Sequence, residues 1–415
     1  MPTLAIDFGT SNSAVAILTP EGLRRLPLEA DSDTLPTAVF FPARGGAMKI
    51  GEAAGEALIA GEEGRYMRAL KSVLGTALFH DSRLIGGRRR TLADVVTAFL
   101  STVKERAEAI SGLTFDAALS GRPVHFHTAD PDRDARAEAD LAACYAAAGF
   151  TSVRFMPEPE AAALSSHGLG ATGKVGLVVD IGGGTSDFSV YRMEGGRLRI
   201  LASHGIRLGG TDFDESVSLS HAMPELGHGS SLRREIGPGT LPMPNALYVD
   251  LATWSRIPFV YTPENRREVA RMVRLATEPE KLERLSAVLE EELGHELAFA
   301  VEHGKIAANG PEGAGVIAMG MIERGLAPVV TGASLDKALE NHRAELARAA
   351  ADTLHLVGIA PESVGTVILV GGSSLMRLVA EEARRLCPAA RIERSHAFTA
   401  VVDGLALALA EEPVA

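Results

Sequence analysis

Two short stretches of this sequence place an Asp at the end of an apolar run and follow it with glycine and hydroxyl residues. The first is IDFGTSNSAVAIL, residues 6–18, and the second is VVDIGGGTSDFSV, residues 178–190. Because glycine has no Cβ, the backbone N–H groups of such turns can converge on an anion. The Thr and Ser hydroxyls add further donors. These residue types favour phosphate binding, and two copies are much stronger evidence than one.

Three carboxylates accompany these donors, namely Asp7, Asp180 and Asp187. Carboxylates repel a bare phosphate, so a site built from both kinds of group needs a cation between them. Magnesium is the usual choice because it binds oxygen ligands and keeps several waters. We therefore expect a magnesium-bound polyphosphate, with the three Asp side chains acting mostly through water.

Each turn lies between two strand patterns, TLAID and SAVAIL around the first, GLVVD and DFSVYRM around the second. This weak internal repeat predicts two related halves, each with its own hairpin. The strand that follows each turn excludes a P-loop and a Rossmann turn, since both of those open a helix. The stretch GLGATGKV, residues 168–175, also fails as a P-loop, because Val175 stands where a metal-binding hydroxyl belongs.

The rest of the chain alternates helices with strands, which indicates α/β architecture. Helical periodicity covers residues 92–109 and 132–148, and a further helix is predicted from Pro159. The C-terminal part predicts a helix at 334–358, a strand at 366–370, a glycine turn and two more helices.

An inserted subdomain is predicted at residues 218–309. Its first part, residues 219–263, is rich in Gly, Pro, Met and His and predicts loops and short elements. Its second part contains a long charged helical stretch at residues 279–309.

The composition is that of an ordinary globular chain. With 46% hydrophobic and 23% charged residues it does not resemble a disordered protein, and 415 residues are enough for two domains. A net charge of -12 argues against nucleic acid or an anionic membrane as a partner. Two cysteines and no recognisable signal peptide or membrane span favour the cytoplasm. We expect a monomer.

Together, these motifs resemble the actin-like ATPase fold, and within it the nucleotide-binding domain of the seventy-kilodalton heat-shock (DnaK-type) chaperones. The two Asp-led turns resemble that family's phosphate motifs. Further likenesses are FMPEPEAAAL at 155–164, RLGGTDFDESV at 207–217 and TVILVGGSSLM at 366–376. The likeness is strongest to the short, chaperone-like YegD group, because MPELGHGS and YVDLATWSRIPFVYTPENR look like its features.

The resemblance implies two ribonuclease-H-like lobes with a nucleotide cleft between them. Lobe I would comprise residues 1–173 and the C-terminal helix at 389–415, and lobe II would comprise 174–388. The implied ligands are ATP or ADP and magnesium, with potassium as a further candidate ion.

The resemblance also implies a role for individual residues. Thr10, Ser11 and Asn12 would contact the β- and γ-phosphates, and Gly182, Gly183, Gly184 and Thr185 would hold them from the other lobe. Lys71, in RALKSVLG, corresponds to the family's catalytic lysine and would balance charge on the transferring phosphoryl group. Asp180 would orient or deprotonate the attacking water, and Glu158 and Thr185 complete the catalytic group.

The remaining residues implied by the resemblance lie on the nucleoside side. They are Gly209, Gly210, Glu302, Lys305, Asn309, Gly371, Gly372, Ser373 and Leu375. Two of them depart from the family pattern, since Leu375 replaces an Arg that packs on adenine and Asn309 replaces a Ser. The Leu forfeits a cation–π contribution of roughly 0.5 to 2 kcal/mol, so base preference is less determined than phosphate binding.

The expected function is slow ATP hydrolysis coupled to lobe closure, because ATP contacts both lobes and ADP lacks the γ-phosphate bridge. The sequence ends at AEEPVA without the family's linker, peptide-binding domain or lid, so a chaperone-like protein without that domain is expected, with an unknown protein partner or client. The alternatives are a nucleotide-controlled scaffold with little or no hydrolysis, an actin-like polymerising protein and a sugar kinase.

One further motif stays open on the sequence alone. His125 and His127 in RPVHFHTAD would share one face of a strand, where a metal pair is conceivable, but no third ligand is near them in sequence. Pro123 matches a proline that the family uses to relay the nucleotide state, and a strand-edge proline is the plain alternative.

Overall fold

The structure is a computed structural model that describes residues 2–30, 32–127, 130–165, 174–194, 197–394 and 398–410. Most of the GLGATGKV stretch, residues 168–173, and the tail from 411 lie outside the described residues. The chain divides into two compact units, Met1–Gly210 with Arg343–Ala415, and Thr211–His342. Each unit is described by itself below.

The first unit contains two sheets with the same strand order. In the first sheet, β1 (Thr3–Phe8), β2 (Asn12–Thr19) and β3 (Gly22–Arg25) form an antiparallel meander, and β10 (Ala117–Arg122) and β11 (Ser152–Pro157) extend it in parallel beyond β1. The short β4 (Leu35–Pro36) pairs with β2.

The second sheet repeats this plan with a meander of β12 (Val175–Ile181), β13 (Ser186–Glu194) and β14 (Arg197–Ile206). Beyond β12, β19 (Val364–Val370) and β20 (Arg391–Arg394) pair in parallel. The predicted internal repeat is therefore confirmed at the level of topology, and each Asp-led turn joins the first two strands of its own sheet.

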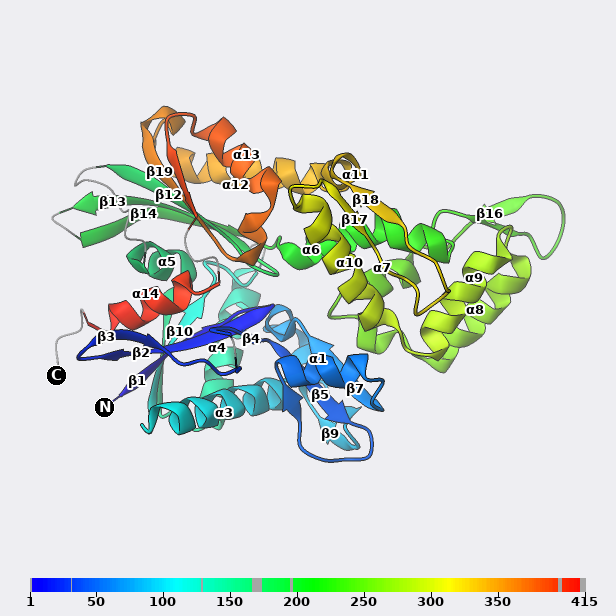
Figure 1. Ribbon diagram of the computed structural model, residues 1–415, viewed down its shortest axis with the longest axis horizontal. Coiled ribbons are helices and arrows are strands. Elements are labelled where there is room, and N and C mark those ends of the chain that lie inside the picture. Colours follow the sequence, from blue (N-terminus) through cyan, green and yellow to red (C-terminus); the bar gives the residue numbers. More distant parts are fainter. Residues whose placement is uncertain are drawn as a thin grey trace. The chain divides into compact units, whose positions relative to one another are not determined.

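Helices α5 (Glu158–Ser165) and α14 (Ala400–Ala408) lie between the two sheets (Figure 1). Both are rich in alanine, which lets them approach closely. A Cβ on Gly404 of α14 would lie 1.6 Å from the carbonyl oxygen of Ala161 in α5, so only glycine fits there. Alanines and branched side chains of both helices share one core with residues of both sheets, including Ala5 and Val178.

The outer face of the first sheet is covered by α3 (Leu92–Ser111) and α4 (Pro131–Ala147), close to the predicted 92–109 and 132–148. A capping box between Thr91 and Asp94 begins α3, and Gly112 in the left-handed conformation ends it. The second sheet is covered by α12 (Glu340–Leu356) and α13 (Arg377–Leu386). The predicted helix at 334–358 is thus two helices, because α11 (Gly332–Ala338) ends at Leu339 before α12 begins.

A small sheet and several short elements follow β4 in the first unit. The sheet pairs β5 (Ala38–Pro42) with β6 (Lys49–Ile50) and β7 (Gly64–Arg68), and α1 (Glu52–Ile59) packs on it. A 3-10 turn, Leu70–Val73, follows β7 and carries Lys71. The helix α2 (Ala77–His80) and the hairpin of β8 (Arg83–Ile85) and β9 (Arg88–Arg90) lead to α3.

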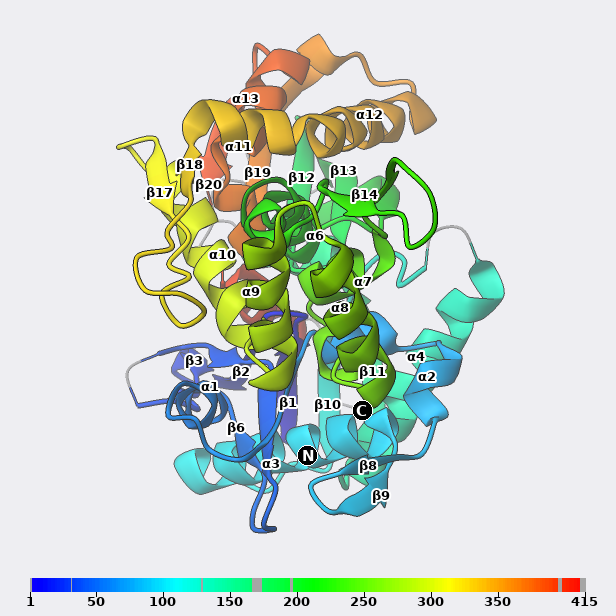
Figure 2. The same ribbon diagram turned by 90° about the vertical axis from the view of Figure 1, so that its right-hand side faces the viewer.

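The second unit begins with α6 (Gly210–Val217), which starts on the last residue of the first unit, and continues with a π-helical turn at Ser218–Ala222. Short elements follow, as predicted for 219–263, including the hairpin of β15 (Ser231–Arg233) and β16 (Thr240–Pro242) and the helix α7 (Ala246–Ala252). Figure 2 shows α8 (Pro263–Leu275) and α9 (Pro279–Glu290) packed side by side.

The predicted helical stretch at 279–309 is likewise divided, into α9 and α10 (Gly294–Asn309). The break lies at Glu292, whose φ of 58° is left-handed. The hydroxyl of Tyr261 donates to the Glu292 carbonyl at 3.1 Å and accepts from the Gly294 N–H at 3.0 Å, so a side chain from elsewhere in this unit fixes the break. The hairpin of β17 (Ala314–Val316) and β18 (Val329–Thr331) packs on α10.

Among the described residues, no helix is both long and apolar enough to span a membrane.

Candidate functional site

The two Asp-led turns of the first unit face each other. A Cβ placed on Gly183 would lie 2.4 Å from Ser11 Oγ and 3.1 Å from Thr10 Cβ, and one on Gly184 would lie 3.4 Å from Thr10 Oγ1. A side chain at Gly183 would fit only if Ser11 and Thr10 of the first turn shifted. The hydroxyl donors of the first turn and the glycine backbone of the second therefore line the same space, as expected for a phosphate site.

Two further glycine-containing segments, Gly209–Gly210 and Gly371–Ser373, contact or lie near the second turn. A Cβ on Gly209 would lie 2.5 Å from the Gly184 nitrogen, and the Gly210 N–H donates to the Gly182 carbonyl at 3.0 Å. A Cβ on Gly210 would lie 2.3 Å from Ser373 Oγ. The sequence-predicted Gly182–Gly184, Gly209–Gly210 and Gly371–Ser373 are thus brought together, although they come from three distant parts of the chain.

Lys71 enters the site from the small 3-10 turn. Its Nζ donates to Glu158 Oε1 at 2.5 Å, and the two side chains are only 6% and 11% exposed. The residue before this turn, Ala69, has a φ of 59°, a left-handed conformation that is unfavourable for a residue with a Cβ. Such local strain is concentrated at functional sites.

The hairpin of the second sheet sets two carboxylates opposite each other, because Asp180 and Asp187 are cross-strand partners. In the first hairpin the partner of Asp7 is Ala14. Asp187 Oδ1 accepts a hydrogen bond from the Val124 N–H at 2.9 Å. Asp180 Oδ2 is buried and accepts no hydrogen bond from the described residues, which leaves one carboxylate oxygen available for a ligand.

Three buried carboxylates, Glu158, Asp180 and Asp187, and the half-buried Asp7 lie around the positive charge of Lys71. Burial and then the charge of Glu158 raise the pKa of Asp7 to about 7, although Lys71 opposes this shift. Burial and neighbouring carboxylates likewise hold the pKa values of Asp180 and Asp187 well above the usual range. Burial alone would lower the pKa of Lys71, but the carboxylates outweigh it and raise that pKa.

This excess of negative charge fits a bound cation. Within the described ranges, no group of three or more His, Cys, Asp or Glu side chains could hold a metal ion by itself. The donor set therefore fits an ion that takes few protein ligands and completes its shell with water and phosphate oxygens, as magnesium does. Asp180 Oδ2, which has no hydrogen-bond partner within the described ranges, and the neighbouring glycines provide polar groups and room for such an ion.

The residues expected on the nucleoside side belong to both units. Lys305, on α10 of the second unit, forms an ion pair of 2.6 Å with Asp214, and Trp254 Nε1 donates to Asp214 Oδ2 at 3.1 Å. Glu302 and Asn309 are half-buried on the same helix, and Asn309 is its last residue. Because Gly371–Ser373 and Leu375 belong to the first unit, the structure describes the two sets separately.

The two histidines of the RPVHFHTAD motif do not lie on a strand, because β10 ends at Arg122. His127 is buried and its Nε2 contacts the Leu74 carbonyl at 2.7 Å. His125 is 45% exposed and lies 3.6 Å from Asp134. The two rings therefore have separate partners.

Sequence reasoning missed two contacts. Asp214 belongs to the GGTDFD motif, which by itself assigns no role to it, and its pairing with Lys305 depends on packing between α6 and α10. The Val124 amide that holds Asp187 is a backbone group and leaves no residue-type signal, but its neighbour Pro123 was noted in the sequence.

Part of the chain is similar to known heat-shock chaperones. The family model described as Hsp70 protein matches residues 81–232. The chain is 32% identical over 218 residues to the chaperone protein DnaK of Thermotoga neapolitana, which covers 52% of this chain and 34% of the relative. It is 33% identical over 219 residues to DnaK of Thermotoga maritima, with the same coverages. The chain thus spans about a third of the length of these relatives.

The repeated sheets and the facing phosphate turns define the class as the actin-like ATPase fold, with two lobes. Within that class, residues 81–232 match the Hsp70 family model, and about half of the chain is similar to DnaK chaperones.

Proposed function

We propose that this protein binds magnesium-ATP between its two glycine turns and hydrolyses it slowly to ADP and phosphate. The observation that carries the proposal is the buried Lys71–Glu158 pair, which lies among three further carboxylates next to the facing turns. A positive charge held in such a place suits the stabilisation of charge on a transferring phosphoryl group. Hsp70 family members are ATPases, which supports the proposal of ATP hydrolysis.

In this proposal, the backbone N–H groups of Gly182–Gly184 and the hydroxyls of Thr10, Ser11 and Thr185 bind the phosphates, with Asn12 beside them. Asp180, whose buried Oδ2 has no partner among the described residues and whose pKa is raised, orients the attacking water and accepts its proton. Lys71 compensates the negative charge, and Glu158 fixes its direction. Asp7 and Asp187 would hold hydrated magnesium, which when bound neutralises phosphate charge.

The proposed nucleoside side draws on residues of both units. Glu302, Lys305 and Asn309 on one unit, and Gly371–Ser373 and Leu375 on the other, would close on the ribose and base, with Gly209–Gly210 beside the phosphates. Loss of the γ-phosphate would then shift the equilibrium between closed and open lobes. The boundaries of lobe I and lobe II, the likeness to the YegD group and a cytoplasmic location belong to this proposal. Because the relatives are chaperones by name, a protein client is the proposed partner.

The test is calorimetric titration with magnesium-ATP and a phosphate-release assay, on the wild type and on Lys71→Ala. The variant should still bind nucleotide but release phosphate more slowly by about 10²-fold or more, as for loss of a key electrostatic group. Lys337→Ala is the matched control, because this lysine is exposed on α11. If the wild type releases no phosphate at saturating magnesium-ATP, hydrolysis is refuted.

The alternative is a nucleotide-controlled scaffold without useful hydrolysis. Nucleotide binding without phosphate release would support this alternative. Light scattering with and without ATP tests the polymerising alternative.

A further inference from the structure

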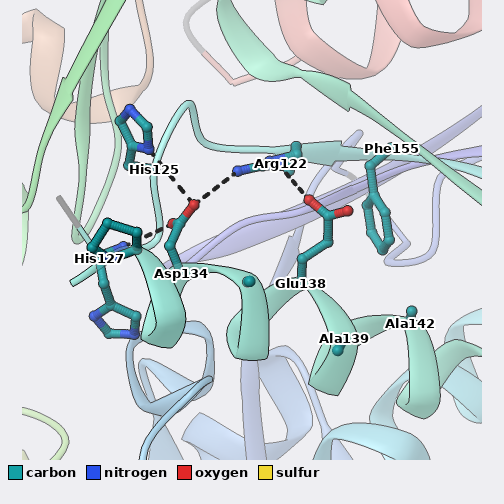
Figure 3. A pocket seen from close by; sticks show the side chains of 10 residues that line it. Arg122, His125, His127, Asp134, Glu138, Ala139, Ala142 and Phe155 are labelled. Atoms are coloured by element: carbon teal, nitrogen blue, oxygen red, sulfur yellow. Dashed lines mark hydrogen bonds and ion pairs between the residues drawn. The ribbon is translucent and has the colours of Figure 1, made fainter.

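A pocket of about 420 Å³ opens in the first unit between the end of β10, α4 and β11 (Figure 3). Its apolar floor is formed by Phe155 of β11 and by Ala135, Ala139 and Ala142 along one face of α4. Its polar wall contains Arg122, His125, Asp134 and Glu138. None of these residues takes part in the proposed phosphate chemistry.

The donors of the polar wall are already used inside the protein. Arg122 Nε donates to the Pro123 carbonyl and Nη2 to the Val124 carbonyl, both at 3.0 Å, and Nη1 donates to Glu138 Oε2. The same guanidinium lies 5.5 Å above the ring of Phe126. The pocket therefore offers no free cation from this arginine.

Acceptors remain in the pocket. Glu138 is 39% exposed and, among the described residues, only its Oε2 accepts a hydrogen bond, so Oε1 is available. Asp134 accepts the N–H groups of Phe126 and His127 with Oδ1. The polar wall contains one positive charge, on Arg122, and two negative charges, on Asp134 and Glu138. It is therefore acidic, and it lies beside an apolar floor.

We propose that this pocket binds an organic cation with an apolar body, such as an aryl-alkyl amine or the basic side chain of an apolar–basic peptide. The ammonium or guanidinium group would pair with Glu138 Oε1, and the apolar body would cover Phe155, Ala139 and Ala142. Charge complementarity excludes a carboxylate of the same size.

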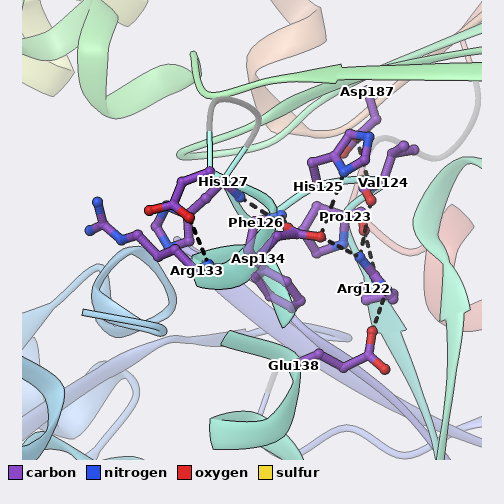
Figure 4. A network of polar contacts seen from close by, with 11 residues as sticks. Arg122, Pro123, Val124, His125, Phe126, His127, Arg133, Asp134, Glu138 and Asp187 are labelled. Atoms are coloured by element: carbon purple, nitrogen blue, oxygen red, sulfur yellow. Dashed lines mark hydrogen bonds and ion pairs between the residues drawn. The ribbon is translucent and has the colours of Figure 1, made fainter. Parts of the chain in front are cut away.

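The pocket is connected to the phosphate site through one short segment (Figure 4). Arg122 holds the carbonyls of Pro123 and Val124, and the Val124 N–H donates to Asp187. Further along the segment, His127 Nε2 contacts the carbonyl of Leu74, three residues after Lys71. A cation that draws Glu138 away from Arg122 would therefore alter how Asp187 is held. This coupling rests on the proposed ATPase function, whereas the binding does not.

Binding is tested on the full chain, without nucleotide, by calorimetric titration with phenethylammonium, with the peptide Ac-Phe-Arg-NH2 and with phenylacetate. One or both cations should bind and phenylacetate should not. Binding of only the amine identifies a small molecule as the natural class, and binding of only the peptide identifies a polypeptide. If neither cation binds at millimolar concentration, or if phenylacetate binds equally well, the pocket proposal is wrong.

Two variants localise the binding. Glu138→Gln keeps the shape of the side chain and should weaken cation binding about tenfold or more, as expected when a charged hydrogen-bond partner is lost. Ala139→Leu, at an exposed position of the floor, should abolish binding by filling the pocket. Glu105→Gln, exposed on α3 and outside the pocket, should leave binding unchanged. Equal affinity in the wild type and Glu138→Gln overturns the assignment.

Phosphate release is then measured with and without the cation that binds. A changed rate in the wild type, but not in Glu138→Gln, supports the coupling. If the rate of phosphate release is unchanged at saturating cation, the coupling is refuted, but the proposed binding site still stands. A wild type that binds the cation but never releases phosphate refutes the proposed ATPase function instead, so the two failures are distinguishable.

Discussion

Lys71 and Glu158 form a buried ion pair of 2.5 Å across 87 positions of sequence. The lysine comes from a 3-10 turn between β7 and α2, and the glutamate is the first residue of α5. A Cβ on Gly121 of β10 would lie 3.2 Å from Glu158 Cγ, so the neighbouring strand leaves little room beside this glutamate. The pair anchors the positive charge of the candidate site among carboxylates that would otherwise repel one another.

The first prediction concerns the pH dependence of stability in the absence of nucleotide and metal. Asp7 has a pKa of about 7 in the folded protein and 3.8 as its ordinary value, so the folded state binds more protons than the unfolded state between these pH values. Stability is therefore fully present below about pH 4 and is lost as pH rises through about 7. Asp180 and Asp187 contribute in the same direction.

Urea unfolding at pH 5 and pH 7 measures this effect. The free energy of unfolding should fall by about 2 kcal/mol over this interval, because one proton contributes about 1.4 kcal/mol per pH unit. Asp7→Asn should flatten the profile, whereas Asp132→Asn, exposed in the first turn of α4, should not. A wild type that becomes more stable towards pH 7 contradicts the assignment.

The second prediction compares two adjacent glycines of the turn. Gly183→Ala places a Cβ 2.4 Å from Ser11 Oγ and 3.1 Å from Thr10 Cβ, so both phosphate-facing residues of the first turn must shift. Gly182→Ala meets only the Thr185 carbonyl, at 3.7 Å, which is an ordinary contact. Calorimetry with magnesium-ATP should show affinity about tenfold or more weaker for Gly183→Ala, which corresponds to about 1.4 kcal/mol, and a much smaller change for Gly182→Ala. Equal effects would show that the close approach of the turns does not matter for binding.

The third prediction tests the contact between the two central helices. Gly404→Ala would bring a Cβ to 1.6 Å from the Ala161 carbonyl oxygen, so α14 and α5 must separate. We expect a loss of about 3 kcal/mol or more in the free energy of unfolding, as for severe overpacking. Gly55→Ala in α1 meets no atom within 4 Å and should stabilise the protein by roughly 0.5–1 kcal/mol. Thermal or urea unfolding measures the stability of both variants. If the two were comparably stable, the close contact between α14 and α5 would not be required for stability.

The fourth prediction concerns the ion pair of the second unit. Lys305→Met leaves the buried carboxylate of Asp214 without its partner, which typically costs about 3–5 kcal/mol. Burial already raises the pKa of Asp214, so the loss should be greater at pH 8 than at pH 5, where the carboxyl takes up a proton more readily.

Trp254, the single tryptophan of the chain, donates to Asp214 and reports unfolding of this unit by fluorescence. Lys337→Met, exposed on α11, is the control. The double variant Lys305→Met with Asp214→Asn should recover part of the lost stability, since it no longer buries an unpaired charge. An unaltered midpoint for Lys305→Met would mean that this pair carries no stability.

The local features of the phosphate site were predictable from residue patterns alone. Alternating apolar residues predicted the strands around both turns, and glycines between them predicted a turn open to an anion, because these features depend on neighbours within a few positions. The repetition of one hairpin also predicted two related halves, which the strand order of the two sheets confirms. Resemblance to a family then supplied the expectation that Lys71 belongs to this site.

The contacts between distant groups could not be predicted in this way. The ion pairs of Lys71 with Glu158 and of Lys305 with Asp214, and the bond from the Val124 amide to Asp187, depend on the packing of elements far apart in sequence. The same reason explains the divided helix at 279–309. Residues 291–293 have ordinary helical composition, but the Tyr261 hydroxyl bonds both sides of the break and holds Glu292 in a left-handed conformation that no local pattern predicts.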